Sequence, residues 1–359
     1  MRHRLGGNAM RYMIGYQLQE SGRLLEEIVR YKDRVHEVYF AWDKMPSGRG
    51  GTITHSNLMP YEATQALFAQ LRYLADQGIH MNLLLNANCY GADALSRRFL
   101  MQTGDLIDDF TEKLNLTSIT TTSPVIAHFV KENFPDLEVR ASVNMEIGTV
   151  EGMEYLSSDF DGFYYKRELN RNIPQLQKLK AWADAHDKKL YMLANSGCLN
   201  FCSARQFHDN LVAHEQEVAK MDNGATFTSM CSNFVKDPEN QKKILRHLNS
   251  VRPEEMELFE PYVVAAKLAT RVSPRPEQIV RAYMEGHHYG NFLELMEPSH
   301  AGAFLPAIVD NTRLPKDYCH HVAYCNKDCE NCNYCAETLS AAIINLDEGG
   351  IMDVNECDD

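Results

Sequence analysis

The sequence has no long apolar segment and is short of positive charge. No run of residues approaches the roughly 18 to 20 uninterrupted apolar positions that a membrane-spanning helix requires, so we expect no membrane partner. The 36 Lys and Arg residues stand against 49 Asp and Glu residues, a formal net charge of −13. Binding to a phosphate backbone needs clustered cations. We therefore expect a small-molecule or peptide-like substrate, and RNA only if the charge is strongly segregated on the surface.

The signature motifs of several enzyme classes are also missing. Gly15 is followed by Tyr16, Gln17 and Leu18, so the glycine-rich phosphate turn of a dinucleotide-binding sheet is absent after the first expected strand. The chain has no His-Glu-x-x-His helix and no Gly-x-Ser-x-Gly elbow, which argues against the common peptidase sites. The N-terminus carries arginines but no apolar stretch typical of a secretory signal, so we expect a cytoplasmic location.

Between residues 11 and 286, short apolar runs alternate with amphipathic stretches, as in βα units around a parallel sheet. Helical spacing of apolar residues marks 61–77 and 170–186. Eight units over roughly 250 residues predict an α/β fold, a (β/α)8 TIM-like barrel over residues 1–286, with an open doubly wound sheet as the alternative. Residues 287–359 are expected to form a Cys-rich C-terminal extension. The expected strands are 11–16, 37–41, 80–85, 118–122, 138–141, 162–165, 189–193 and 263–269.

Ten cysteines are the unusual part of the composition. In a large acidic chain without an export signal, thiolates are expected to bind metals rather than to form disulfides. Four of them lie in the expected extension with spacings that suit one metal centre, either a [4Fe–4S] cluster or zinc, where His320 or His321 could replace a sulfur. Cys325, Cys329 and Cys332 also have the spacing of the cluster-binding cysteine triad of radical S-adenosylmethionine enzymes, although that triad normally follows an early barrel strand. The four are Cys325, Cys329, Cys332 and Cys335.

Three further cysteines lie at or after the end of the seventh expected strand. Cys198 and Cys202 are separated by three residues, which places both thiolates within reach of one metal or one cluster. Cys231, on the connection to the eighth strand, is the third candidate ligand. Unreactive buried cysteine is the alternative interpretation.

Polar residues directly after the expected strands are the candidates for catalysis, because the active site of a (β/α)8 barrel is built from the loops that follow its strands. Each of them also suits an ordinary solvated loop. After the fifth, sixth and eighth strands, the candidates are Asn144, Arg167, Glu168 and Arg271.

Three stretches of the chain carry a family resemblance. They are residues 140–146 with 162–169, which include Lys166-Arg167-Glu168-Leu169, then residues 195–205, and residues 251–255 with 266–271. With them the chain resembles, over roughly residues 80–286, the family historically labelled peptidase U32. These are barrel proteins whose better understood members are iron–sulfur proteins acting in oxygen-independent hydroxylation.

The resemblance implies a [4Fe–4S] cluster at the barrel mouth, held by Cys198, Cys202 and Cys231. Their spacing departs from the commonest family pattern, which leaves the fourth ligand open between Cys89, after the third strand, and Cys319 in the extension. The cysteines of the extension would then hold a second cluster, or zinc.

The resemblance also assigns roles at the mouth. Arg167 and Arg271 become carboxylate clamps, since a guanidinium binds a carboxylate through two parallel hydrogen bonds, with helix capping or pairing to Glu168 as the alternative. Asn144 would orient a ring substituent or form a tight turn. The predicted function is an iron–sulfur enzyme of oxygen-independent hydroxylation or a related redox modification of a small-molecule, peptide or RNA substrate.

Two other functions stay open. The chain could be a non-catalytic metal-binding scaffold whose partner, a related subunit as in some family members, supplies the chemistry. It could also be a peptidase, as the family label says, with a serine or cysteine site assembled from residues far apart in the sequence.

Overall fold

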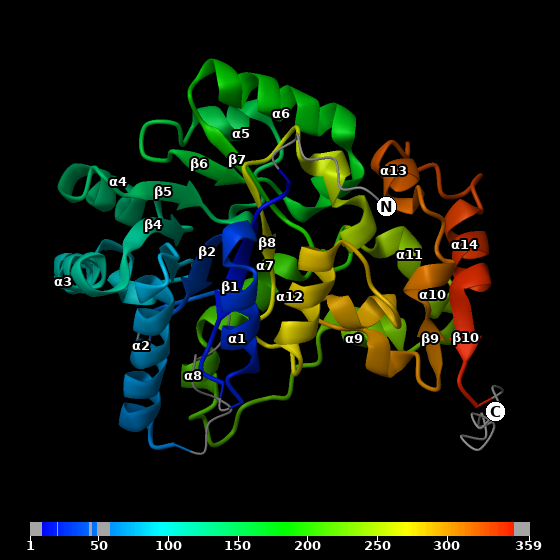
Figure 1. Ribbon diagram of the computed structural model, residues 1–359, viewed down its shortest axis with the longest axis horizontal. Helices are drawn as coiled ribbons and strands as arrows, with labels where there is room; N and C mark the ends of the chain where they lie inside the picture. Colours follow the sequence, from blue (N-terminus) through cyan, green and yellow to red (C-terminus); the bar gives the residue numbers. More distant parts are fainter. Residues whose placement is uncertain (1–8, 20, 43–44, 49–57, 348–359) are drawn as a thin grey trace.

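The computed structural model describes residues 9–19, 21–42, 45–48 and 58–347, and its centre is a closed barrel of eight parallel strands (Figure 1). Neighbouring strands pair in sequence order, and β8 pairs with β1 to close the barrel. The predicted (β/α)8 barrel is therefore confirmed. Cys357 lies outside the described residues. The strands are β1 Tyr12–Tyr16, β2 Val35–Phe40, β3 Met81–Leu85, β4 Leu116–Thr121, β5 Glu138–Ala141, β6 Gly162–Tyr164, β7 Lys189–Leu193 and β8 Ala265–Leu268.

Helices connect the strands and cover the outside of the barrel (Figure 1). The predicted helices over 61–77 and 170–186 correspond to α2 and α6. The helices after the first six strands and after β8 are α1 Arg23–Arg30, α2 Pro60–Asp76, α3 Arg97–Leu114, α4 Pro124–Asn133, α5 Val150–Glu154, α6 Ile173–Ala185 and α12 Pro276–Glu285.

The long connection from β7 to β8 departs from this pattern, because it holds a series of short helices. Further single turns of 3-10 helix join other elements of the barrel. The short helices between β7 and β8 are α7 Arg205–Ala213, α8 Glu215–Val218, α9 Met230–Val235, α10 Pro238–Gln241, α11 Ile244–His247 and η5 Pro253–Phe259. The other 3-10 turns are η1 Lys32–Arg34, η2 Gly91–Leu95, η3 Val143–Met145 and η4 Arg167–Arg171.

The start of α6 shows how the sequence sets the loop that carries the site. The residues from Arg167 to Arg171 form the separate turn η4, and the α-helix begins only at Ile173. Asn172 stops the turn and caps the helix, since its side-chain oxygen accepts the backbone N–H of Gln175 at 3.2 Å. Pro174 in the first turn suits the helix start, where its missing N–H leaves no bond unmade. This cap holds η4 at the mouth of the barrel.

The interior of the barrel is polar at one level, although the outward faces of the strands are apolar and pack under the helices. Glu37 of β2 accepts Asn82 Nδ2 and Ser118 Oγ, each at 3.0 Å. Arg140 of β5 lies across the barrel, with Nη1 2.5 Å from Glu37 Oε1. Met13 of β1, in register with Glu37, contacts Arg140 at 3.6 Å from Nη1 to Sδ, so this polar level is bordered by apolar side chains.

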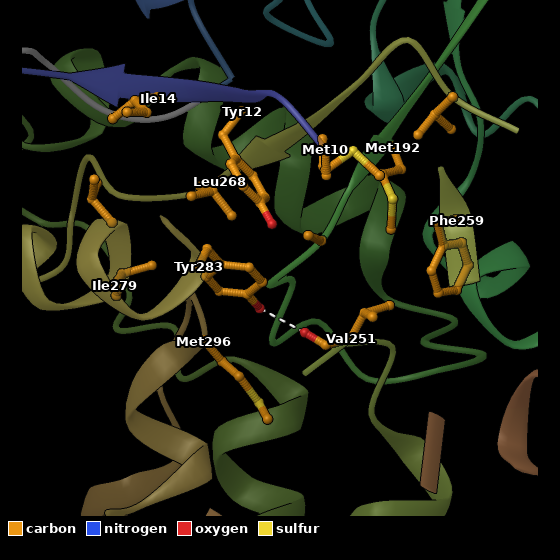
Figure 2. Packing of buried hydrophobic residues seen from close by; sticks show 14 of the residues in the cluster. Met10, Tyr12, Ile14, Met192, Val251, Phe259, Leu268, Ile279, Tyr283 and Met296 are labelled. Carbon is orange, nitrogen blue, oxygen red and sulfur yellow. Dashed lines mark hydrogen bonds between the residues drawn. The ribbon is translucent and has the colours of Figure 1, made fainter. Parts of the chain in front are cut away.

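The C-terminal extension follows Gly286, which ends α12 in a left-handed conformation at φ 71°. It packs against the barrel, and Figure 2 shows one part of the shared core, where the Tyr283 hydroxyl donates to the carbonyl of Val251 at 2.6 Å beside Met296. None of the described helices is long and apolar enough to cross a membrane. The extension contains η6 Phe292–Leu295, η7 Ala301–Ala303, β9 Ala307–Val309, η8 Asn311–Arg313, α13 Tyr318–Ala323, α14 Tyr334–Ala342 and β10 Ile343–Asn345, with β9 and β10 antiparallel.

Candidate active site and metal centre

The polar residues that follow β5 and β6 meet at the mouth of the barrel. Arg167 Nη2 donates to Asn144 Oδ1 at 2.8 Å, and Arg167 Nη1 donates to Glu146 Oε1 at 2.7 Å. Arg205 Nη1, from the start of α7, lies 2.8 Å from Glu146 Oε2 and 2.9 Å from Glu168 Oε1. These five residues are called the mouth network below. Three of the four predicted catalytic residues, Asn144, Arg167 and Glu168, thus lie in one contact group.

Glu146 and Arg205 belong to this network but were not predicted as site residues. Glu146 ends the turn η3 in the left-handed region at φ 54°, and this conformation directs its carboxylate between two guanidinium groups. Burial raises the pKa of Glu146, while the charges of Arg167 and Arg205 oppose that rise. The signal in the sequence was the position of Glu146 in the same post-strand turn as Asn144.

Two hollows adjoin the mouth network, and both are lined by Glu146, Glu168 and Phe201. The larger, called the mouth pocket, has a volume of about 420 Å³ and is also lined by Asn88 and Cys202. The smaller, called the lysine pocket, has a volume of about 230 Å³ and is also lined by Lys166 and Lys327. Lys327 comes from the extension, so the lysine pocket joins the barrel mouth to the Cys-rich segment.

Several buried atoms of the mouth network still have bonding capacity. In the described part of the chain, no hydrogen-bond partner is found for Arg167 Nε, Arg205 Nε or Glu168 Oε2. A buried polar atom without a partner is costly, by about 1–3 kcal/mol. Such atoms beside a pocket are therefore expected to bind a polar ligand or ordered water.

Arg271, the fourth predicted catalytic residue, lies beside Tyr39 and Lys267 inside the barrel. Its guanidinium carbon is 6.0 Å from the centroid of the Tyr39 ring, and Lys267 Nζ is 3.9 Å from the same centroid. Burial, reinforced by the charge of Arg271, lowers the pKa of Lys267 to about 7. The amine is thus able to take up or release a proton near neutral pH.

Four cysteines of the extension, Cys325, Cys329, Cys332 and Cys335, lie between the end of α13 and the first turn of α14. Cys335 is close enough to Cys325 and Cys329 for their charges to interact, and Cys332 is exposed to solvent. The backbone N–H of Lys327 donates to Cys325 Sγ at 3.2 Å. These four residues are called the extension cysteines below.

Positive side chains from the barrel surround the extension cysteines. Arg171 Nη2 of η4 is 3.8 Å from Cys335 Sγ, and Arg246 Nη2 of α11 donates to the carbonyl of Cys329 at 3.0 Å. The Lys327 ammonium lies 5.2 Å from the centroid of Phe201, which lines the mouth pocket. Because thiolate-bound metal centres are anionic, this surrounding charge suits one.

Cys198, Cys202 and Cys231 are the predicted ligands at the barrel mouth, and their surroundings differ from one another. Cys202 and Cys231 line one apolar hollow of about 570 Å³, and Cys198 is near enough to Arg205 for their charges to interact. Over the described ranges, no three His, Cys, Asp or Glu side chains are grouped so that they could hold a metal ion. The metal sites at the barrel mouth and in the extension therefore stay predictions.

The two options for a fourth ligand at the mouth have other partners. The thiol of Cys319 is buried and accepts the backbone N–H of Arg252 at 3.3 Å, and burial raises its pKa. Cys89, after β3, accepts the N–H of Gly91 at 3.4 Å, and the neighbouring His214 side chain lowers its pKa. Among the described residues, neither thiol completes a group of three that could hold a metal ion with the cysteines of the mouth.

No family model matches the chain, and no curated protein matches it. Among solved structures, the chain is similar to a U32 peptidase, with a TM-score of 0.47 and 14% identity over 62% of this chain and 83% of that chain. It is also similar to a GH113 β-1,4-mannanase, with a TM-score of 0.38 and 10% identity over 77% of this chain and 98% of that chain. A mandelate racemase/muconate lactonizing family protein from Azoarcus sp. EbN1 gives a TM-score of 0.35 and 15% identity over 60% of this chain and 52% of that chain.

Proposed function

We infer that the protein is an iron–sulfur enzyme that performs a redox modification at the barrel mouth. Oxygen-independent hydroxylation is the reaction that the sequence resemblance implies. The observation that carries the proposal is the position of the extension cysteines: cationic side chains surround them, and Lys327 between them lines the same pocket as Glu168.

The ligands that the extension offers are of the type that iron–sulfur clusters use. Four thiols within eleven residues supply the usual number of ligands. Arg171, Arg246 and Lys327 offset the negative charge that four thiolates bring. A bound cluster would supply an electron conduit or a Lewis-acidic iron beside the substrate.

The residues of the mouth would bind and orient an anionic substrate. The lysine pocket and the adjoining mouth network carry four cations against two carboxylates, Glu146 and Glu168. Arg205 lines the mouth pocket, and its unpartnered Nε is a donor for a carboxylate oxygen. A small carboxylate-bearing molecule therefore fits better than folded RNA, since this cationic group is small and the whole chain is acidic.

Metal analysis of protein purified without oxygen tests the proposal. We expect about eight iron atoms and about eight sulfides per chain, because two [4Fe–4S] clusters are predicted. Cys332→Ala should lose about four of each, and Cys198→Ala should lose the other four. Cys319→Ala tests the fourth ligand of the mouth cluster, which is open between Cys319 and Cys89: loss of about four irons would assign it to Cys319, and full iron content would leave Cys89.

Other results would overturn the proposal in distinguishable ways. Absence of iron from strictly anaerobic protein would leave the scaffold and peptidase alternatives. Zinc could be found bound by the extension cysteines, with iron lost only from Cys198→Ala. The extension would then hold a structural zinc site and would not be part of a redox site.

A further inference from the structure

The lysine pocket takes its two cations from different parts of the chain. Lys166 directly precedes η4 of the barrel, and Lys327 lies in the extension between α13 and α14. The Lys166 stem runs over Gly148, where a β-carbon would lie only 2.5 Å from Lys166 Cε. Lys327 Nζ lies 5.2 Å from the centroid of the Phe201 ring, which lines the same pocket. The barrel and the extension thus contribute one ammonium group each.

These two ammonium groups have no anion of their own. The carboxylates of Glu146 and Glu168 also line the pocket, but arginines of the mouth network already hold them. In the part of the chain that the structure describes, no ion pair is found for Lys166 or Lys327. Two ammonium groups on one small hollow favour a bound anion, because opposite charges attract more strongly where water is partly excluded.

The size and the walls of the pocket restrict which anion fits. Its volume is about 230 Å³, and a cavity of roughly 150 Å³ is enough for one benzene molecule. Leu169 and Phe201 add apolar surface to the wall, which suits a ligand with an apolar body. A dianion is disfavoured because Glu146 and Glu168 lie beside the site and like charges repel. The ligand class that fits best is a small monocarboxylic acid.

The position of Lys327 depends on the cysteines around it. Its backbone N–H donates to Cys325 Sγ at 3.2 Å, and its φ of 63° is uncommon for a residue other than glycine. The same loop is tied to the barrel by Arg171, which belongs to the same turn as Glu168 and has Nη2 3.8 Å from Cys335 Sγ. A metal bound by the extension cysteines would therefore fix the loop that carries Lys327.

We propose that the lysine pocket binds the carboxylate of a small monocarboxylic acid between Lys166 and Lys327, and that a metal held by the extension cysteines strengthens this binding by fixing Lys327. The inference rests on the metal centre of the proposed function, whether iron or zinc occupies it, and not on the redox chemistry. Linkage is reciprocal, so the bound carboxylate must strengthen metal binding by the same factor.

Titration calorimetry with benzoate, on protein purified without oxygen, tests the carboxylate site. We expect Lys166→Gln and Lys327→Gln each to weaken benzoate binding on the order of tenfold, because each removes a charged donor. Benzamide has the same shape without the charge, so it should bind weakly and respond to neither change. Lys316→Gln is the matched control, since this exposed lysine of the extension lines neither pocket of the mouth. Benzoate binding that ignores both pocket lysines would overturn the proposal.

The same titration with and without metal tests the linkage. Removal of the metal by a chelator, or Cys332→Ala, should weaken benzoate binding about fivefold or more. In Lys327→Gln, removal of the metal should cause no further loss, because the group that the metal fixes is gone. Saturating benzoate should also slow the loss of metal to the chelator in wild type and not in Lys327→Gln.

Metal content measured on the same samples separates this inference from the proposed function. Wild-type protein that carries metal in the extension, and whose benzoate affinity does not change when the metal is removed, would overturn the linkage and leave the iron–sulfur function standing. Absence of any metal from strictly anaerobic wild type would overturn both.

Discussion

Replacing Arg140 with methionine should lower the free energy of unfolding by about 3 to 5 kcal/mol, which is the usual cost of breaking a buried ion pair from one side. Arg140 lies in the barrel interior, with Nη1 2.5 Å from Glu37 Oε1 and Nε 2.8 Å from Glu138 Oε1. Glu37 is only 1% exposed, so its carboxylate would stay buried with only the neutral donors Asn82 and Ser118. Urea unfolding followed by circular dichroism measures the loss.

Two variants separate the ion pair from general damage to the barrel. Lys180→Met removes the exposed pair with Asp184 on α6 and should change the free energy of unfolding by about 0.5 kcal/mol or less. The double variant Arg140→Met with Glu37→Leu should recover part of the loss, because no charge then remains unpaired. A single Arg140→Met variant as stable as wild type would show that water reaches this level of the barrel.

Replacing Lys267 with methionine should stabilise the protein more at pH 6 than at pH 10, by a difference on the order of 4 kcal/mol. Burial lowers the pKa of Lys267 from 10.5 to about 7, and each unit corresponds to about 1.4 kcal/mol. Below about pH 7 the buried amine is charged, so the full penalty is present in wild type. Between pH 7 and 10.5 the unfolded chain binds more protons, so wild-type stability rises with pH.

The measurement is the free energy of unfolding of both proteins across this pH range. In wild type, the attraction of the ammonium to the Tyr39 and Tyr164 rings, whose centroids are 3.9 and 5.2 Å away, offsets part of the penalty at low pH. The exposed Lys220→Met is the matched control, because its ammonium stays in water in both states. A difference between wild type and Lys267→Met that does not vary with pH would contradict the lowered pKa.

The strands of the barrel could be predicted to within about two residues because each is buried on both faces. Continuous apolar runs bounded by polar turns identify such strands. The connection between β7 and β8 could not be predicted, since its helices from α7 to α11 are held by contacts with distant loops. Arg246, for example, reaches the carbonyl of Cys329 in the extension.

The predicted catalytic residues also show which features follow from local sequence and which depend on contacts between distant segments. Asn144, Arg167 and Glu168 were found because they follow strands, and all such residues converge on one end of a parallel barrel. Their partner Arg205 was not found, because it reaches the mouth from a helix beyond β7. The position of Arg271, beside Lys267 and Tyr39, depends on packing across the barrel interior.

The sequence by itself determined the barrel, the strand positions and the chemical inventory of thiols and mouth residues, since burial periodicity and residue type are local properties. Only the tertiary structure decided which groups meet. Glu146 follows β5 and Arg205 begins α7, yet barrel closure brings Arg205 Nη1 to 2.8 Å from Glu146 Oε2. Likewise, Lys267 sits in an apolar run, and its pKa is lowered because the closed barrel removes its amine from water. Such pairings and burial depend on contacts between residues far apart along the chain, which no local pattern encodes.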